Sequence, residues 1–441
     1  MPQLPGDPGA ESATRAATTI AYLVGHYPGT SIAFILREIV AIRQAGWRVL
    51  TTSVREPDVP GNGFTQIEGE EAAQTFYIKR RGYVLLFLDQ LACFCTRPIT
   101  YFRGAWKAIT LAGPDLQQLV FYAFYFVEAT ALGRWLSQKR VNHLHVHFAN
   151  AACTVAILVH EVYGISYSVS IHGPDEFYNV RRYRVLEKVQ GALFVRCISN
   201  FCRSQLMCVT SPQQWSKMEI CRLGVDPDRW LPRPVPQNKV LTLLCLGRLV
   251  PAKGQVILLR SAAQLIAAGV RFHIFFIGDG QDAGKLKEEA SRLGLESAVT
   301  FFGSANQDLL VSFWKKADIF VLPSFAEGVP VSLMEAMSME IPCISTTVGG
   351  ISELIETGKE GILVPPSDPI ALTEAIQRLA NDPRLRDELG RAGRLKILRL
   401  YDLRRNAMQM AALFSRKLQA QLEPAYGKHP PRDDVRSFSH I

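Results

Sequence analysis

Several features that would assign a chain to a common class of protein are missing from this sequence of 441 residues. The nine cysteines include no CxxC pair and show no spacing typical of a disulfide framework. We therefore expect reduced thiols that pack as small apolar side chains. Residues 1–17 are polar and contain no apolar segment like that of a signal peptide. These absences predict a cytoplasmic protein.

Long apolar runs are also missing, since no stretch reaches the roughly 18–20 residues that a membrane-spanning helix needs. Two shorter apolar stretches, residues 83–95 and 119–132, are interrupted by Asp89 and Gln90 and by Glu128. We expect core helices at both places. The alternative is an in-plane, peripheral contact with the cytoplasmic face of the plasma membrane.

Charge of one sign is not gathered into long runs, although the formal net charge is +9. The densest basic groups are residues 79–81, 181–184 and 404–405, and none resembles a nucleic-acid-binding arm. We therefore predict no nucleic-acid partner. The basic surplus suits a solvated surface, a patch that faces anionic lipid, or phosphorylated small molecules as ligands.

Short apolar runs and amphipathic segments alternate along most of the chain. Residues 19–25 are typical of a buried strand, residues 31–46 of a helix that ends at Gly46, and residues 47–54 of a second strand. Further strands are expected at 143–148, 167–173, 193–199, 240–247, 273–278, 299–303, 319–324 and 341–346. Strand, helix and strand in succession form the unit of a doubly wound parallel sheet, so the predicted fold class is α/β.

A proline-rich segment divides the chain, because residues 225–238 contain four prolines. It predicts two Rossmann-like domains that face each other across a cleft. We place the boundaries as follows: a disordered N-terminus at 1–17, an N-terminal domain at 18–230, a linker at 231–239, a C-terminal domain at 240–395, a C-terminal helix at 396–421 that could cross back to the first domain, and a disordered tail at 422–441.

Residues that follow a strand are the candidates for a site, because open α/β sheets bind ligands at the carboxyl ends of their strands. Gly29 and Thr30 lie in a loop after the first strand, where a plain turn is the alternative. His172 closes another strand and could contact sugar hydroxyls or a phosphate, or could be structural.

Residues 143–148 read HLHVHF, which places three histidines on one face of a strand. Such a face could bind a metal ion, but the sequence offers no second cluster of ligands. We favour cleft lining or core packing and predict no metal.

Arg248 and Lys253 lie in the stretch LGRLVPAKG, where a strand ends and a helix is expected to begin. Two cations at such a junction suit a diphosphate, since arginine can bind two oxygens at once while lysine supplies a point charge. The alternative is a surface loop.

Two glutamates, Glu327 and Glu335, bracket an expected helix start in SFAEGVPVSLMEAMS. Pro330 suits the first turn of a helix, whose amides and dipole favour an anion. Carboxylates are poor partners for a phosphate but good acceptors for the paired hydroxyls of a sugar. A ligand that combines sugar, diphosphate and ribose would explain both; two solvated charges beside a surface helix would explain them equally well.

These segments resemble the retaining glycosyltransferases of group 1 (family 4), which have the GT-B fold. EGVPVSLME matches the E-x7-E motif of that family, and CRLGVDPDRW, GRLVPAKG, IGDGQ and VTFFGS resemble its other blocks in the same order. YPGTSIAFILREIVAIRQAGWRV, HLHVHFAN and SIHGPDEF resemble a bacterial exopolysaccharide branch similar to colanic acid enzymes. The resemblance covers roughly residues 18–420.

The resemblance implies a role for each matching residue. Arg248 and Lys253 would bind the donor diphosphate, and Glu335 the nucleotide ribose. Glu327 would contact the donor sugar, aided by the backbone amides around Gly328 and Val329. His172 would lie at the transfer site, so His172 and Glu327 are the catalytic candidates.

The resemblance also implies a nucleotide-sugar donor, a hexose-type sugar, retention of configuration and a saccharide acceptor that is lipid-linked. It implies no cofactor and no metal. The family branch often has Ser-Glu-Thr-Phe where residues 31–34 read SIAF, so the neighbouring acceptor-side loop with Gly29 and Thr30 leaves the acceptor open. The alternatives are a soluble acceptor, as for sucrose or trehalose synthases, and a non-catalytic scaffold subunit.

Overall fold

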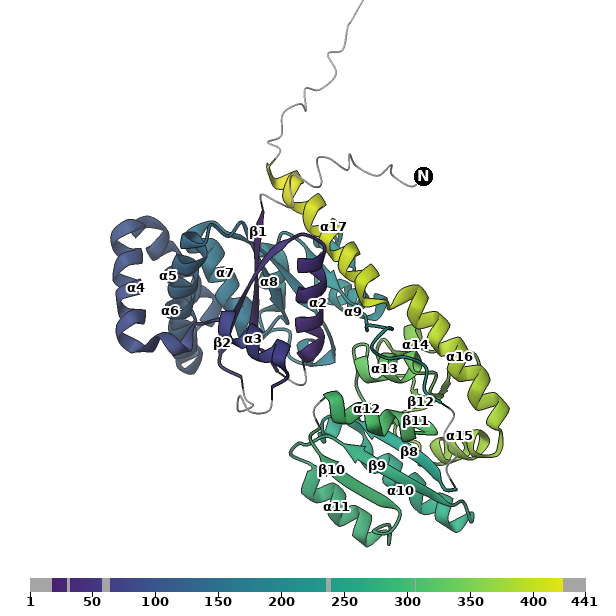
Figure 1. The fold of residues 1–441 in the computed structure, drawn as a ribbon. Coiled ribbons are helices and arrows are strands. Elements are labelled where there is room, and N and C mark those ends of the chain that lie inside the picture. Colours follow the sequence, from purple (N-terminus) through teal and green to yellow (C-terminus); the bar gives the residue numbers. More distant parts are fainter. Residues whose placement is uncertain (1–17, 30–31, 58–63, 235–238, 306, 423–441) are drawn as a thin grey trace, which may run out of the picture.

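The computed structural model describes residues 18–29, 32–57, 64–234, 239–305 and 307–422 (Figure 1). These residues form two α/β domains, each built on one parallel sheet, so the predicted fold class is confirmed. Thr30 and the ends for which we predicted disorder, apart from Leu422, lie outside the described residues.

The N-terminal sheet has seven strands in the described part of the chain, in the order β3-β2-β1-β4-β5-β6-β7. All its pairs are parallel. The order reverses direction between β1 and β4, which are neighbours, and the crevice at such a point is where doubly wound sheets bind ligands. The bounds are β1 Thr19–His26, β2 Arg48–Arg55, β3 Phe76–Tyr77, β4 His143–His147, β5 Ser166–Ile171, β6 Val195–Cys197 and β7 Met218–Ile220.

The C-terminal sheet is also parallel and shows six strands among the described residues, in the order β10-β9-β8-β11-β12-β13. Its direction reverses between β8 and β11, so this domain has the same kind of crevice. The bounds are β8 Leu241–Leu246, β9 Phe272–Ile277, β10 Val299–Gly303, β11 Ile319–Leu322, β12 Cys343–Thr346 and β13 Ile362–Val364.

Helices connect the strands, and several begin at side chains that cap them. Asn150 accepts a bond from the amide of Ala152 at the start of α7, and Ser199 accepts one from Cys202 at the start of α9. No helix in the described part of the chain is both long and apolar enough to cross a membrane. The helices are α2 Ala33–Gln44, α3 Gln66–Gln74, α4 Gly82–Thr96, α5 Pro98–Ala112, α6 Leu116–Gln138, α7 Ala151–Tyr163, α8 Val185–Gly191, α9 Asn200–Val209, α10 Gln255–Ala267, α11 Ala283–Arg292, α12 Gln307–Lys316, α13 Val331–Ser338, α14 Ile351–Leu354, α15 Pro369–Asn381, α16 Pro383–Leu400 and α17 Leu403–Leu422.

Helices α4, α5 and α6 form a separate layer beside the N-terminal sheet, at the left of Figure 1. Helices α5 and α6 pack on α7, and α4 packs on α5 and α6. The expected core helix at residues 83–95 is wrong, because Asp89 and Cys93 are the only buried residues of α4. Residues 119–132 fall in α6, whose inner side does join the core through Tyr122 and Phe126.

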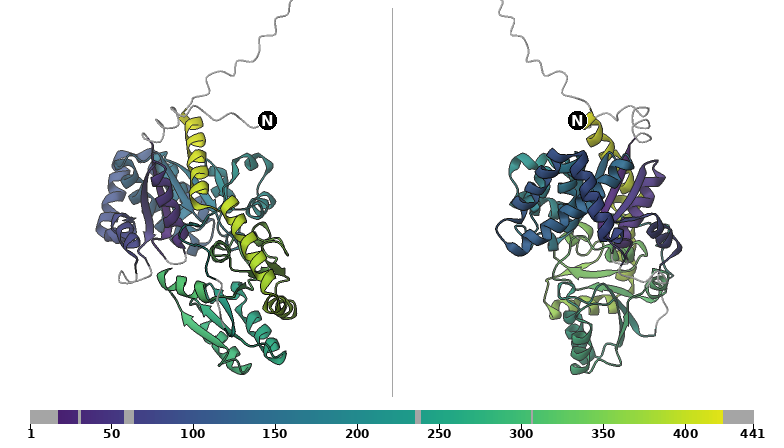
Figure 2. Two further views of the ribbon diagram at one scale, coloured as in Figure 1. Left: turned by 45° about the vertical axis from the view of Figure 1, so that its right-hand side comes forward. Right: turned by 90° about the vertical axis from the view of Figure 1, so that its left-hand side faces the viewer.

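The chain connects the two domains at two neighbouring points. The amide of Val225 donates to the carbonyl of Tyr401 at 2.9 Å, and the amide of Leu403 donates to the carbonyl of Val225 at 3.0 Å. Helix α16 then packs on α13 of the C-terminal domain, while α17 packs on α2 of the N-terminal domain. Figure 2 shows these two yellow helices running along both domains. Met410 and Phe414 of α17 are fully buried in the N-terminal core.

Candidate active site

A cavity of about 720 Å³ lies between the two domains, where the chain leaves β5, β8 and β11. Both domains contribute to its lining, which the two sheet crevices would lead one to expect. Every predicted site residue that the structure describes, except Gly29, lines it: His172, Arg248, Lys253, Glu327, Gly328, Val329 and Glu335.

The acceptor-side loop is only partly described. Gly29 does not line the cavity, and Thr30 lies outside the described residues. The next residues, Ile32, Ala33 and Phe34, do line it. Phe34 also lies beside His172, with ring centroids 5.2 Å apart.

Two cations lie on the C-terminal side of the cavity, after β8. Lys253 Nζ is 2.6 Å from Glu327 Oε1, and the Ser324 hydroxyl donates to the same oxygen at 2.7 Å. The Arg248 side chain is exposed and forms no ion pair with any other residue that the structure describes. One cation is therefore held by a carboxylate, while the other is available to an anionic ligand.

The loop before α13 reaches the opposite domain at Gly328. A Cβ atom at this position would collide with the carbonyl oxygen of His172, so the close approach of the two backbones requires glycine. Pro330 is the N-cap of α13, one position before the helix rather than in its first turn. The amides at the start of α13 and its dipole favour an anion at this end of the cavity.

Glu335 is buried on α13 and meets a partner from the other domain. Arg37 of α2 donates to Glu335 Oε1 at 3.1 Å, and its guanidinium lies over the Trp230 ring, 5.9 Å from the centroid. Burial raises the pKa of Glu335, and Arg37 opposes part of that rise. Sequence analysis missed Arg37. The available signal was its position four residues after Ala33, which puts both on one face of a helix that begins at the cleft.

His172 is buried at the end of β5, where its Nε2 lies 2.9 Å from Nδ1 of His147. Burial lowers the pKa of His172 well below its ordinary value, so the imidazole is neutral near pH 7. No described residue forms a hydrogen bond with its Nδ1. A neutral imidazole at a cavity can donate or accept a hydrogen bond to a hydroxyl group.

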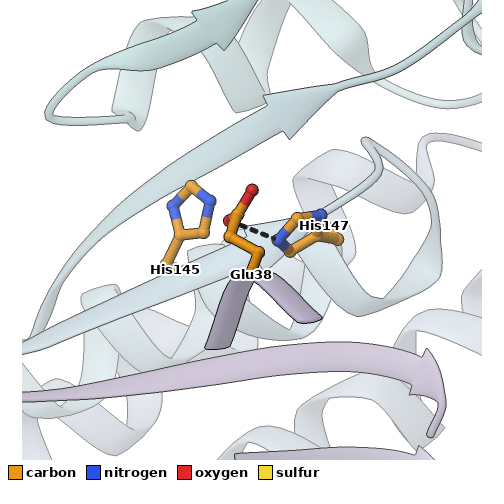
Figure 3. Close-up of side chains that lie close together, drawn as sticks. All are labelled: Glu38, His145 and His147. Atoms are coloured by element: carbon orange, nitrogen blue, oxygen red, sulfur yellow. Dashed lines mark ion pairs between the residues drawn. The ribbon is translucent and has the colours of Figure 1, made fainter. Parts of the chain in front are cut away.

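A buried polar network lies behind His172. Glu38 of α2 is 3.5 Å from Nε2 of His147, and it accepts bonds from Arg196 at 2.5 Å and from the Tyr22 hydroxyl at 3.2 Å. Figure 3 shows Glu38 close to His147, joined to it by the dashed line. Burial alone would raise the pKa of Glu38, but Arg196 and His147 hold it below its ordinary value. Glu38 is therefore a buried carboxylate with a full set of partners.

The same group of side chains could be taken for a metal site, because ligand atoms of Glu38, His145 and His147 lie within 4.8 Å of one another. The surrounding contacts oppose that assignment. Both ring nitrogens of His145 already lie within hydrogen-bond distance of serine hydroxyls, and a cation would compete with Arg196 for Glu38. We interpret the histidines of β4 as buried polar packing.

Glu176 is a second residue that sequence analysis missed. It accepts bonds from the amides of His172 at 2.6 Å, Gly173 at 3.2 Å and Ala149 at 2.5 Å, so it ties the ends of β4 and β5 together. Burial raises its pKa to about 7, although the three amides act in the other direction. The signal was its place three residues after Gly173, the spacing of a capping box.

Comparison with known proteins adds to this geometry. Residues 228–396 match the family described as Glycosyl transferases group 1. A protein of Escherichia coli (strain K12) that carries the name colanic acid biosynthesis glycosyltransferase WcaL is 28% identical over an alignment of 381 residues, and the alignment covers 81% of this chain and 89% of the relative.

Solved structures show a similar fold. The sucrose-phosphate synthase of Thermosynechococcus elongatus has a TM-score of 0.70 at 19% identity and covers 92% of this chain and 100% of its own. HepE of Anabaena in complex with UDP has a TM-score of 0.69 at 16% identity and covers 90% of this chain and 100% of its own.

The two α/β domains and the cavity between them give the chain the GT-B fold of these solved structures. Residues 228–396 of the C-terminal domain match the group 1 glycosyltransferases, and the similarity over 81% of the chain to a relative named as a glycosyltransferase indicates an enzyme of that kind, dependent on a nucleotide sugar.

Proposed function

We propose that the enzyme transfers a hexose-type sugar, with retention of configuration, from a nucleotide-sugar donor to a lipid-linked saccharide during bacterial exopolysaccharide synthesis. The similarity to a relative named for colanic acid biosynthesis supports the pathway class. The E-x7-E pair Glu327 and Glu335 supports retention, because that motif belongs to retaining enzymes of this family. With a lipid-linked acceptor, the transfer would take place at the cytoplasmic face of the plasma membrane.

The observation that carries the proposal is that Glu327, Glu335, Arg248, Lys253 and the start of α13 all line one cavity. Glu327 would accept hydrogen bonds from the donor sugar, and Glu335 from the ribose hydroxyls. Arg248 and the amides at the start of α13 line the same cavity and would bind the diphosphate. Lys253 already balances Glu327, so the site can hold a carboxylate beside a phosphate.

Transfer requires the nucleoside diphosphate to leave with its negative charge stabilised. Arg248, Lys253 and the N-terminus of α13 are placed to supply that stabilisation, so we propose that no metal or cofactor takes part. His172 is neutral and would orient the sugar by a hydrogen bond rather than carry a charge.

The test is to incubate the enzyme with a panel of nucleotide sugars and to measure nucleoside-diphosphate release in the presence of EDTA. We expect slow release from one donor without an acceptor, and faster release with a lipid-linked saccharide. Faster release with glucose or fructose instead would show a soluble acceptor. Failure of the enzyme to bind any donor would overturn the proposal in favour of a scaffold.

A further inference from the structure

Helix α4 has its polar and apolar sides reversed relative to a helix that faces water. Its one acidic residue, Asp89, is fully buried and pairs with Arg81 at 2.7 Å and Arg134 at 3.0 Å. Gln90 also points inward, where it accepts a bond from the Tyr101 hydroxyl at 3.1 Å. The apolar residues are left on the outer side. Tyr83, for example, is 91% exposed.

The neighbouring helices continue this apolar surface. Fifteen of the thirty large apolar side chains that are exposed in the described part of the chain lie on α4, α5 and α6, which we call the apolar face. Contiguous exposed apolar surface on a soluble domain usually marks a binding surface. The residues are Tyr83, Val84, Leu85, Phe87, Leu88, Leu91 and Phe94 of α4, Ile99, Phe102, Trp106 and Ile109 of α5, and Leu116, Val120, Phe121 and Phe124 of α6.

The segment that carries the apolar face is rich in basic residues, of which Arg80 and Arg103 pair with acids outside it. Residues 79–140 contain nine Lys or Arg and only three Asp or Glu, a surplus of six in a chain whose net charge is +9. Two of the three acids, Asp89 and Glu128, are buried and paired with basic side chains. Asp115 is the one acid of this segment that reaches the surface.

We propose that the apolar face docks on a lipid bilayer that carries anionic headgroups. The apolar side chains would enter the boundary between headgroups and acyl chains, and the basic residues would lie against the lipid phosphates. The role of this docking, which is to bring the cavity to a lipid-linked acceptor, rests on the proposed function. The binding to the bilayer does not, and it can be measured without any sugar.

Charge selects the bilayer over a second copy of the chain. A two-fold contact through the apolar face would place the same basic surface against itself, and like charges at close range disfavour association. An anionic bilayer complements both the apolar and the basic parts of the surface. It also explains why the acidic groups of α4 and α6 are buried and paired instead of exposed.

The experiment is flotation of the full chain with vesicles of phosphatidylcholine alone or mixed with phosphatidylglycerol. We expect flotation with the mixed vesicles and much less with phosphatidylcholine. The triple variant Tyr83→Ser, Phe87→Ser, Ile99→Ser should bind mixed vesicles at least about tenfold more weakly, because it removes three inserted side chains. Replacing Arg80 and Lys107 by Gln should also weaken binding about tenfold.

The control removes two exposed apolar side chains from the other domain, Ile370→Ser and Leu395→Ser, which are 61% and 68% exposed. This variant should float like the wild type. Trp106 gives a direct readout, since brominated lipid should quench its fluorescence and the quenching should fall in Trp106→Phe. All of these variants should keep donor-driven nucleoside-diphosphate release without an acceptor.

Three results would overturn the docking surface. They are absence of flotation with any vesicle, equal flotation of the triple variant, and a dimer in light scattering that the triple variant loses. Flotation with no turnover of any nucleotide sugar would instead leave the docking surface standing and remove the proposed function.

Discussion

The two domains build one cavity from different chemical groups. The C-terminal domain supplies charged side chains at the cavity wall, namely Arg248, Lys253, Glu327 and Glu335. The N-terminal domain supplies one charged side chain, Arg37, and a neutral imidazole, His172, which is supported by buried polar groups that extend inward. The family match covers the C-terminal domain, while the apolar face lies on the N-terminal one. The comparison indicates a C-terminal half built to the pattern of the matched family and an N-terminal half that carries the apolar face.

The largest expected difference between the two domains is in how much stability each loses at low pH. Burial lowers the pKa of His143, His145, His147 and His172 in the N-terminal domain. Unfolded histidines take up a proton near pH 6.5, so this stability is present above that pH and is lost as the pH falls. At pH 5.5 the loss should be about 1.4 kcal/mol for His143, whose pKa burial lowers to about 3. Glu176, with a raised pKa of about 7, offsets part of the loss.

Hydrogen exchange at pH 7.5 and 5.5, corrected for intrinsic rates, measures this prediction. Amides of β4 and β5 should lose protection, while β8 and β11 keep theirs. The His143→Asn variant should show a smaller dependence on pH. Equal losses in both sheets would contradict the prediction.

Arg196→Met should break the N-terminal network. It leaves the Glu38 carboxylate buried without its main cationic partner, which typically costs about 3–5 kcal/mol of unfolding free energy. The control is Arg404→Met, which removes an exposed pair with Asp228 and should cost less than about 1 kcal/mol. Urea denaturation measures both. Similar losses in the two variants would show that the buried pair has no special role.

Arg248→Ala should test the charged side of the cavity. It should weaken nucleoside-diphosphate binding by about 1.5–3 kcal/mol, as expected for the loss of a charge-assisted bond, and should leave stability nearly unchanged. Lys287→Ala, an exposed lysine on α11, is the control. Calorimetry measures the affinity, and an unchanged value for Arg248→Ala would remove the diphosphate assignment.

Glu335→Gln should give the smallest effect and test the contact between the domains. The neutral amide keeps an acceptor for Arg37 but binds ribose hydroxyls less strongly, so nucleotide affinity should fall by about 1 kcal/mol. Stability should fall less than affinity. Glu388→Gln on the surface of α16 is the control. A loss of stability without a loss of affinity would make Glu335 a structural residue.

Most strands of the two sheets and the charged side of the cavity were predictable from the sequence, because local signals specify them, whereas the short strands β3, β7 and β13 were not predicted. Buried parallel strands are short apolar runs, and the predicted strand at 299–303 coincides with β10. Arg248, Lys253 and Glu327 each follow a strand, so their approach to one cavity required only the rule for strand ends.

The contacts between domains were not predictable in this way. Arg37 and Glu335 are 298 positions apart, and their ion pair depends on how two separately folded sheets face each other. The prediction of a core helix at residues 83–95 was wrong for a related reason. Hydrophobicity shows that a helix avoids water, but it does not show whether protein or lipid covers the helix. The structure shows Asp89 on the inner side of α4, while Tyr83 on its outer side is 91% exposed in the described part of the protein.

The position of α17 has a consequence for how the chain is made. Met410 and Phe414 complete the core around β1 and α2, yet they are among the last described residues to leave the ribosome. Domains generally fold as units during synthesis, starting from the N-terminus. Here the first domain to emerge must keep an apolar surface uncovered until the second has been translated, so the two halves of the enzyme reach their final state together.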